Sequence, residues 1–368
     1  MGGSVLVSGA GVAGLALASW LDRGGWAVTV VERAPGLRAG GQAVDIRGVA
    51  LEVAERMGVL AEVADLRTRA RGMSVLDGQG NELMRTTEST FSAGRLDGED
   101  VEVLREDLTR ILHAHVGERV QYLFGDSVTG LAPYEDGVKV TFERAAAREF
   151  DLVVGADGLH SRVRDLAFGP EGEYLDPLGI RLAVYSAENF LGLEDWQVWL
   201  RDGDAGYGIY PVRGNTELRV TLGWPGSPRD PGHRNVARQK ELAAEAMAGL
   251  GWETPRLLAE MAKAPDFYCD LMARIRMDGW SRGRTVLLGD AGYCASPLSG
   301  QGTSLALVGA YVLAQELGRA DHPVAFARYE ERMRPFVELN QALATENPGG
   351  PASEESVERA KNAISLDG

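Results

Sequence analysis

Short runs of apolar residues recur along the chain, and longer stretches with helical spacing lie between them. The runs predict buried strands at residues 5–8, 27–31, 152–155 and 286–288. Helical spacing predicts helices at residues 13–21, 49–57 and 303–317. This alternation of strands and helices indicates an α/β fold with a Rossmann-like parallel sheet.

The middle and the end of the chain have other patterns. Residues 180–223 alternate in strand fashion, which predicts an antiparallel sheet with a hairpin near residues 202–206. Residues 323–344 carry an apolar helical stripe, made of Phe326, Tyr329, Met333 and Phe336. We expect this helix to be core packing with a kink at Pro335. The polar residues from 347 onward are expected to be loosely attached.

The string GAGVAG follows the first predicted strand. Its first glycine permits a tight turn, its second lets backbone approach a pyrophosphate, and its third lets the helix pack close to the sheet. The N-terminus of that helix offers N–H groups and a positive dipole end to phosphates. Glu32, 18 residues after Gly14, is placed to bond ribose hydroxyls. The residues of this predicted dinucleotide site are Gly9, Gly11, Val12, Ala13, Gly14, Glu32 and Arg33.

This motif has two alternative interpretations. A glycine-rich turn between a strand and a helix can exist without any ligand. The motif also does not separate NAD from FAD, so a plain NAD dehydrogenase remains open at this point.

Two later strings narrow the choice. In FDLVVGADGLHSRVR, Asp157 and Gly158 turn the chain and Ser161 begins a helix, although an ordinary Asp-Gly turn with a serine cap has the same pattern. In TVLLGDAGYCASPLSGQG, Asp290 ends a strand and can accept hydrogen bonds from ribityl or ribose hydroxyls. The alternative for the second string is a glycine-rich loop before a buried helix.

The loop after Asp290 suits a flat ligand. Pro297 stiffens it, and Gly300 and Gly302 keep Cβ atoms away from the ligand. The helix that begins at Thr303 directs its positive end back at the loop, where it would stabilise an anionic reduced flavin ring.

Composition and charge exclude several function classes. The 368 residues are 45% apolar and 25% charged, as in ordinary globular proteins, and their net charge of −15 disfavours nucleic acid and anionic membranes as partners. The two cysteines, Cys269 and Cys294, predict a reduced, cytoplasmic setting. We expect no signal peptide, no membrane span, no metal site and no Ser-His-Asp set.

With these three strings at these spacings, the chain resembles the flavin-dependent monooxygenases of the para-hydroxybenzoate hydroxylase type. It looks most like their short members, which include the tetracycline-inactivating monooxygenases. The resemblance covers roughly residues 4–345, and VLREDLTRIL at residues 103–112 matches the family helix that places Arg105 on the flavin cofactor. The alternative for Arg105 is a surface salt bridge. One departure stands out: Gly292 and Tyr293 replace the Ala-His of the usual GDAAH string.

The resemblance implies an enzyme in which NADPH reduces FAD, and O₂ then hydroxylates an aromatic or enolic small molecule through a flavin C4a-hydroperoxide. It implies that the flavin does the chemistry, with residues 40–47 beside it and Arg47 near the moving ring or the pyridine nucleotide; the alternative is a surface loop. The expected division is an FAD-binding domain (1–72, 98–168, 281–321), a substrate domain (73–97, 169–280), a bracing helix (322–346) and a polar tail (347–368). We expect a monomer or weak homodimer.

Substrate recognition is expected on the antiparallel sheet. An aromatic wall with polar tips suits a planar phenolic or enolic substrate, single or polycyclic. The candidates are Arg181, Tyr185, Gln197, Trp199, Tyr207, Tyr210 and Arg219. Each could instead be an ordinary sheet residue, and the alternation alone does not tell which face points inward.

Two further hypotheses stay open. The same fold supports other flavin chemistry, such as halogenation or reduction of a double bond. The string YGIYP at residues 207–211 lacks the tryptophans of the halogenase motif W-x-W-x-I-P. A protein that sequesters a small molecule and keeps FAD only as scaffold is the remaining class.

Overall fold

The predicted apolar runs form one sheet. In the computed structural model, which describes residues 2–228, 235–347 and 350–367, this six-stranded sheet has the order β19–β20–β13–β1–β2–β9. The strands are β1 (Ser4–Ser8), β2 (Ala27–Glu32), β9 (Gln121–Phe124), β13 (Leu152–Gly155), β19 (Ser281–Arg282) and β20 (Thr285–Leu287). Neighbours pair in parallel apart from β19 with β20, which confirms the expected Rossmann-like α/β fold.

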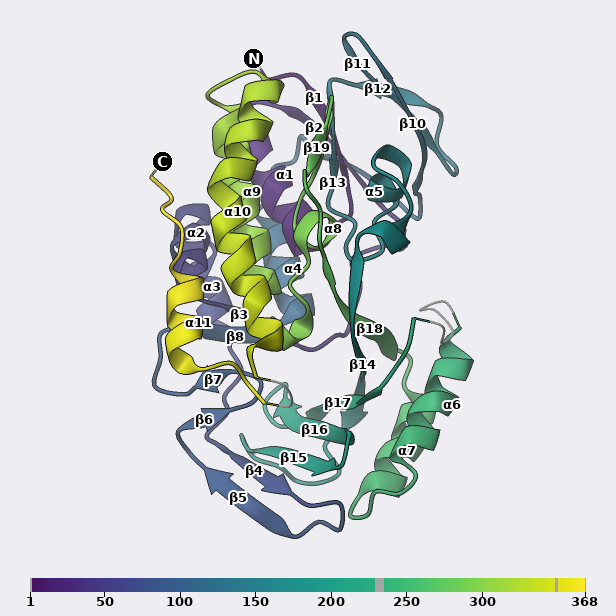
Figure 1. Cartoon of the computed structure of the whole chain (residues 1–368), viewed down its shortest axis with the longest axis vertical. Helices are drawn as coiled ribbons and strands as arrows, with labels where there is room; N and C mark the ends of the chain where they lie inside the picture. The colour runs from purple at the N-terminus through teal and green to yellow at the C-terminus, as the bar shows by residue number, and fades with distance from the viewer. Residues whose placement is uncertain (1, 229–234, 348–349, 368) are drawn as a thin grey trace.

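Helices surround this sheet (Figure 1). Helix α1 lies against β1 and β2, α9 packs on α1, and α10 packs on α9. The helices are α1 (Val12–Arg23), α2 (Val49–Met57), α3 (Leu60–Asp65), α4 (Arg105–Ala114), α5 (Arg162–Ala167), α8 (Asp290–Tyr293), α9 (Gly302–Leu317) and α10 (His322–Glu346), with 3-10 turns at Glu171–Glu173 and Pro297–Ser299. A small sheet of β10 (Val128–Tyr134), β11 (Gly137–Phe142) and β12 (Arg148–Phe150) adjoins α5.

A second sheet has the strand order β18–β14–β17–β16–β15–β4–β5. Its strands are β4 (Met73–Leu76), β5 (Glu82–Thr86), β14 (Leu175–Glu188), β15 (Gln197–Asp202), β16 (Ala205–Val212), β17 (Glu217–Pro225) and β18 (Tyr268–Ile275). The predicted hairpin joins β15 to β16. Helices α6 (Val236–Met247) and α7 (Thr254–Lys263) lie beside this sheet and share an apolar core with it (Figure 1).

Two short antiparallel strand pairs lie outside the larger sheets. Strand β3 (Ala43–Ile46) pairs with β8 (Val101–Leu104), and β6 (Ser89–Thr90) pairs with β7 (Gly94–Arg95). The Ala43 amide on β3 donates to the Tyr210 hydroxyl on β16, and the Arg47 amide just past β3 donates to Ser304 on α9. The β3–β8 pair is therefore bonded to both parts of the molecule.

The C-terminal part corrects one expectation. The stripe of α10 is buried core, as predicted, and α10 continues through Pro335. The residues beyond it are docked, not loosely attached: α11 (Glu354–Lys361) buries Ala360, and Leu366 is only 3% exposed. Lys361 pairs with Asp100 at 3.0 Å. A few apolar side chains within a polar segment are enough to hold it against the core.

Across the described residues, no helix combines the length and the apolar composition needed to cross a lipid bilayer.

Candidate functional site

The glycine fingerprint has the geometry that its sequence predicts. Gly9 has a φ of +108°, and its backbone lies so close to Ala156 that a Cβ there would overlap the Ala156 carbonyl. A Cβ on Gly14 would overlap the carbonyl oxygen of Gly9, so the start of α1 needs glycine for close packing. A Cβ on Gly11, in contrast, would meet nothing within 4 Å. The open side of this turn therefore leaves room for a phosphate group at the start of α1.

Glu32 braces this turn at the end of β2. Its carboxylate accepts hydrogen bonds from the amides of Ala10 at 2.9 Å and Ala34 at 2.8 Å. Arg33, next to it, is exposed. A carboxylate has about four acceptor positions, so Glu32 keeps acceptor capacity for the predicted contact with a ribose. That contact stays a prediction.

Asp157 organises the second string. Its carboxylate accepts from Ser161 Oγ at 2.5 Å and from the Arg162 amide at 2.9 Å, and it also bonds Ser8 on β1. Ser161 in turn caps α5, as its sequence pattern predicts. Burial raises the pKa of Asp157, and the hydrogen bonds from Ser161 and from backbone amides oppose that rise. The turn at Asp157 and Gly158 is thus bonded to β1, the strand that precedes the glycine fingerprint.

Asp290 is the acidic residue of the third string, which covers residues 285–302. It begins α8 directly after Gly289, whose φ is +63°. The side chain is exposed, yet surrounding protein atoms desolvate it and raise its pKa. A group that is accessible and also surrounded lies on the wall of a concave site. A Cβ on Gly302 would stand 3.8 Å from Asp290, so the carboxylate and the start of α9 face the same space.

The loop between them carries an unsatisfied amide. Gln301 is 0% exposed, and neither its side-chain oxygen nor its nitrogen has a hydrogen-bond partner among the described residues. Leaving both atoms of a buried amide unpaired costs about 1–3 kcal/mol each. Gln301 lies between Gly300, with a φ of +64°, and Gly302 at the start of α9. Its unpaired atoms call for a ligand that offers both donors and acceptors.

Arg47 extends from the end of β3 to this loop. Its guanidinium carbon lies 3.7 Å from the position of a Cβ on Gly300, and its amide donates to Ser304 on α9. The guanidinium donates to Asp45 at 2.8 Å and to the Ser92 carbonyl at 3.4 Å, while its Nε has no partner among the described residues. Arg47 is therefore a buried cation beside the loop at residues 297–302, which we call the glycine loop.

Arg105 begins α4 and holds the segment before β3. Its guanidinium donates to the carbonyl oxygens of Ala39 at 3.5 Å and Gly40 at 2.5 Å. Burial lowers the pKa of Arg105 to about 10. Gly40 and Gly41 have φ values of +70° and +100°, a conformation that side-chain-bearing residues rarely adopt. Arg105 lies in the predicted cofactor region, but the bonds that the structure shows go to this loop.

The seven candidates on the sheet divide between its two faces. Tyr185 and Tyr207 point to α6 and α7, where their hydroxyls bond Leu257 O and Thr254. Arg181 has the same parity as Tyr185 along β14 and lies near Cys269 of that helix-side core. The expectation that these three share a wall with the others is therefore corrected. Alternation on a sheet that is covered on both faces reveals parity but not direction.

The opposite face carries Gln197, Trp199, Tyr210 and Arg219. Gln197 donates to Ser92 Oγ at 2.7 Å and accepts from Trp199 Nε1 at 3.0 Å. Arg219 donates to the Gly41 carbonyl at 3.0 Å. Tyr210 and Arg219 thus bond β3 and the segment that leads into it, and Gln197 is linked to Arg47 through Ser92.

The four side chains on this face form a wall, which we call the substrate wall. Two further residues that contact it belong to no recognisable sequence motif. Ser92, between β6 and β7, bonds both Arg47 and Gln197 and so joins the glycine loop to the sheet. Phe91 stacks edge-on against Trp199 with ring centroids 5.3 Å apart, and it is 46% exposed. A serine and a phenylalanine in a short hairpin form no motif, so only the spatial neighbours reveal them.

Tyr293, which replaces the family histidine, is used structurally. Its hydroxyl bonds the Tyr329 hydroxyl on α10 at 2.8 Å, and its ring is 1% exposed. The substitution ties the loop after Asp290 to the bracing helix. Across the described ranges, no group of three or more His, Cys, Asp or Glu side chains is arranged to hold a metal ion.

These features fit FAD. The open side of Gly11 suits a pyrophosphate, and the exposed carboxylate of Asp290 suits ribityl hydroxyls. The unpaired amide atoms of Gln301 suit the polar edge of a flavin ring. The fold and this site define a flavin-binding α/β enzyme.

The comparisons with known proteins agree. Residues 3–340 match the family model described as FAD binding domain, and the chain belongs to this family. It is 51% identical to the uncharacterized protein Rv1260 of Mycobacterium tuberculosis strain H37Rv over 99% of both chains. It is 39% identical to a flavin-dependent monooxygenase from an unknown prokaryotic organism, covering 92% of this chain and 88% of the other.

Solved structures give the same result. The crystal structure of tetracycline destructase Tet(51) superposes with a TM-score of 0.87 and 34% identity over 99% of this chain and 96% of the other. The protein is therefore an FAD-dependent oxidoreductase of the aromatic-hydroxylase type, as its motifs indicate.

Proposed function

We propose that the protein is a monooxygenase that uses NADPH and O₂ to hydroxylate an aromatic or enolic small molecule. The observation that carries this proposal is the wall that runs from the glycine loop through Arg47 and Ser92 to Gln197 and Trp199. Its aromatic and hydrogen-bonding groups would line the space next to the predicted flavin position. The similarity to monooxygenases and to a tetracycline destructase supports a phenolic or polycyclic substrate.

The residues of the chain would act as follows. Asp290 and Glu32 would bind cofactor hydroxyls, and the start of α1 would bind the pyrophosphate. The N-terminus of α9 would stabilise negative charge near the loop. When bound, FAD supplies hydride acceptance from NADPH and activation of O₂. Trp199 and Phe91 would cover the planar face of the substrate and exclude water.

The test begins with flavin content. Purified protein should be yellow, and Asp290→Ala should weaken FAD binding by at least about tenfold, because the cofactor loses a charged acceptor. Asp97→Ala, at an exposed carboxylate paired with Arg95, is the matched control and should retain FAD. Wild-type flavin affinity in Asp290→Ala would contradict the assignment.

The second stage tests the reaction. Aromatic compounds, tetracycline among them, are screened for stimulated oxidation of NADPH, and mass spectrometry looks for gain of one oxygen atom. Product with oxygen from labelled O₂ supports the proposal. A yellow protein that reduces a double bond without consuming O₂ would favour the reductase alternative, and one that binds ligands without NADPH oxidation would favour sequestration.

A further inference from the structure

A buried group of charges lies behind Arg47. Asp45 on β3 and Glu102 on β8 are directly opposite each other in the antiparallel register, and they are 7% and 6% exposed. Asp45 accepts from Arg47 at 2.8 Å, and its other oxygen has no partner among the described residues. Glu102 accepts from Thr68. Two buried carboxylates thus face one another with one arginine beside them.

The surrounding charges do not balance this pair. Asp100 lies nearby, and Lys361 of α11 pairs with it, so that cation is already used. The Tyr210 hydroxyl, from β16, adds no positive charge. The three carboxylates are those of Asp45, Glu102 and Asp100, and the two cations are Arg47 and Lys361. If every group ionised, one negative charge would remain without a compensating cation. Burying an uncompensated charge is costly, so the pair favours holding one proton.

Titration of Asp45 agrees with this count. Burial raises the pKa of Asp45 to about 7; Arg47 opposes the rise, and the negative charges of Glu102 and Asp100 add to it. Burial also raises the pKa of Glu102, against hydrogen bonds from Ser92 and Thr68. Two such neighbours titrate as a pair, and the proton belongs to both.

The pair borders the proposed substrate wall. Arg47, which bonds Asp45, adjoins Gly300, and Ser92 links Arg47 to Gln197. Arg47 keeps an unpaired Nε although it is only 8% exposed. A buried cation with a free donor is suited to an anionic oxygen. An anion there would compete with Asp45 for the guanidinium.

From this arrangement, and resting on the proposed function, we propose that the site binds an acidic hydroxyl compound as its anion together with one proton. The ionised phenol or enol oxygen lies against Arg47, and the proton is held by Asp45 and Glu102. Above about pH 7, where the pair has lost its proton, a neutral compound transfers its hydroxyl proton to the pair, so its O–H bond breaks and a carboxyl O–H bond forms. Below about pH 7 the pair already holds its proton, and the hydroxyl proton of a neutral compound leaves to solution. Where the free compound is already ionised, the proton that the pair gains comes from solution. No oxidant or reductant takes part.

The first experiment measures this proton directly. The probe is 2,4-dinitrophenolate, which is ionised throughout the neutral range, and tetracycline is a second probe. Isothermal titration calorimetry of the FAD-loaded protein, without NADPH, in two buffers of different ionisation enthalpy gives the protons taken up on binding. At about pH 8 we expect uptake of up to one proton per bound probe. As pH rises above about 7, affinity should fall by up to about tenfold per pH unit.

Asp45→Asn and Glu102→Gln keep the shape of the pair but remove its shared proton site. Both should lower the proton uptake toward zero and flatten the pH dependence of affinity. Asp97→Asn is the matched control and should change neither. Equal uptake in wild type and in Asp45→Asn, no uptake in wild type, or no binding of either probe would each overturn the proposal.

A second measurement needs no ligand and no FAD. Difference infrared spectroscopy of the protein between about pH 6 and pH 8 should show a protonated carboxyl band that disappears in Asp45→Asn. Its absence from wild type would overturn the proposal. Failure here leaves the monooxygenase proposal standing if substrate-dependent NADPH oxidation is found, so the two failures are distinguishable.

Discussion

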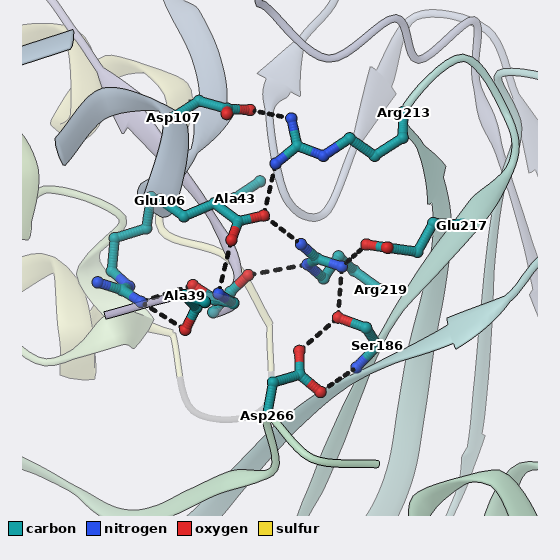
Figure 2. A network of polar contacts seen from close by, with 12 residues as sticks. Ala39, Ala43, Glu106, Asp107, Ser186, Arg213, Glu217, Arg219 and Asp266 are labelled. Carbon is teal, nitrogen blue, oxygen red and sulfur yellow. Dashed lines mark hydrogen bonds and ion pairs between the residues drawn. The ribbon is translucent and has the colours of Figure 1, made fainter. Parts of the chain in front are cut away.

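Arg219 on β17 donates a hydrogen bond of 2.8 Å to Glu106 at the start of α4 (Figure 2). Arg219 is 1% exposed and also donates to the Gly41 carbonyl, while Glu106 accepts from the Gly40 amide at 2.7 Å. The pair therefore bonds both ends of the Gly40–Gly41 dipeptide, namely the Gly40 amide and the Gly41 carbonyl. It joins the antiparallel sheet to the loop that leads into β3 and Arg47.

Removing Arg219 should destabilise the protein strongly. Arg219→Gln leaves Glu106 and the Gly41 carbonyl without a buried cationic partner, and we expect a loss of about 3 kcal/mol in the free energy of unfolding. Chemical denaturation measures it. Arg238→Gln is the control, because Arg238 is exposed and pairs only with the exposed carboxylates of Glu241 and Glu245 among the described residues. It should cost less than about 1 kcal/mol. Similar losses in both variants would contradict the role assigned to Arg219.

The fingerprint glycines should separate stability from cofactor binding. Gly14→Ala places a methyl group on the Gly9 carbonyl and should lower the free energy of unfolding by about 3 kcal/mol. Gly11→Ala meets no protein atom, so stability without FAD should stay within about 0.5 kcal/mol of wild type. FAD affinity in Gly11→Ala should fall by at least about tenfold, since the methyl group occupies the phosphate approach. Unchanged FAD affinity there would place the pyrophosphate elsewhere.

Local patterns predicted much of this fold. They fail where a contact joins segments that are far apart in the sequence. The glycine turn at residues 9–14 is encoded within a few residues, so its strand, turn and helix could be placed. Tyr207 and Tyr210 could be assigned to opposite faces, but not to the helix side or the β3 side, because both faces are covered. Ser92 and the facing of Asp45 with Glu102 depend on contacts between distant segments.

His160 should make stability depend on pH in the alkaline range. Its ring bonds Glu171 at 3.0 Å and Asp270 at 2.9 Å. Burial lowers the pKa of His160, but the bonds with Asp270 and Glu171 outweigh it and raise the pKa to about 9. Because the folded state holds this proton more tightly, the stabilisation is complete below about pH 6.5 and is lost as pH rises through about 9.

The measurement compares unfolding free energies of wild type and His160→Gln from about pH 6 to pH 10. Their difference should shrink steadily between about pH 6.5 and pH 9. His322→Gln serves as control. Burial lowers the pKa of His322, so the effect of its titration on stability is confined to pH values below about 6.5. A constant difference between wild type and His160→Gln would show that His160 is not charged in the folded protein.

The docked C-terminus should contribute measurably to stability. Leu366 is 3% exposed in the core, and the Arg332 guanidinium donates to its carbonyl at 3.2 Å. Leu366→Ala removes buried apolar volume and should cost about 2–4 kcal/mol in chemical denaturation. Glu355→Ala, at an exposed position of α11, should cost less than about 0.5 kcal/mol. If Leu366→Ala matched that control, residues 362–367 would be free in solution, and the polar composition of this segment would have predicted its behaviour correctly.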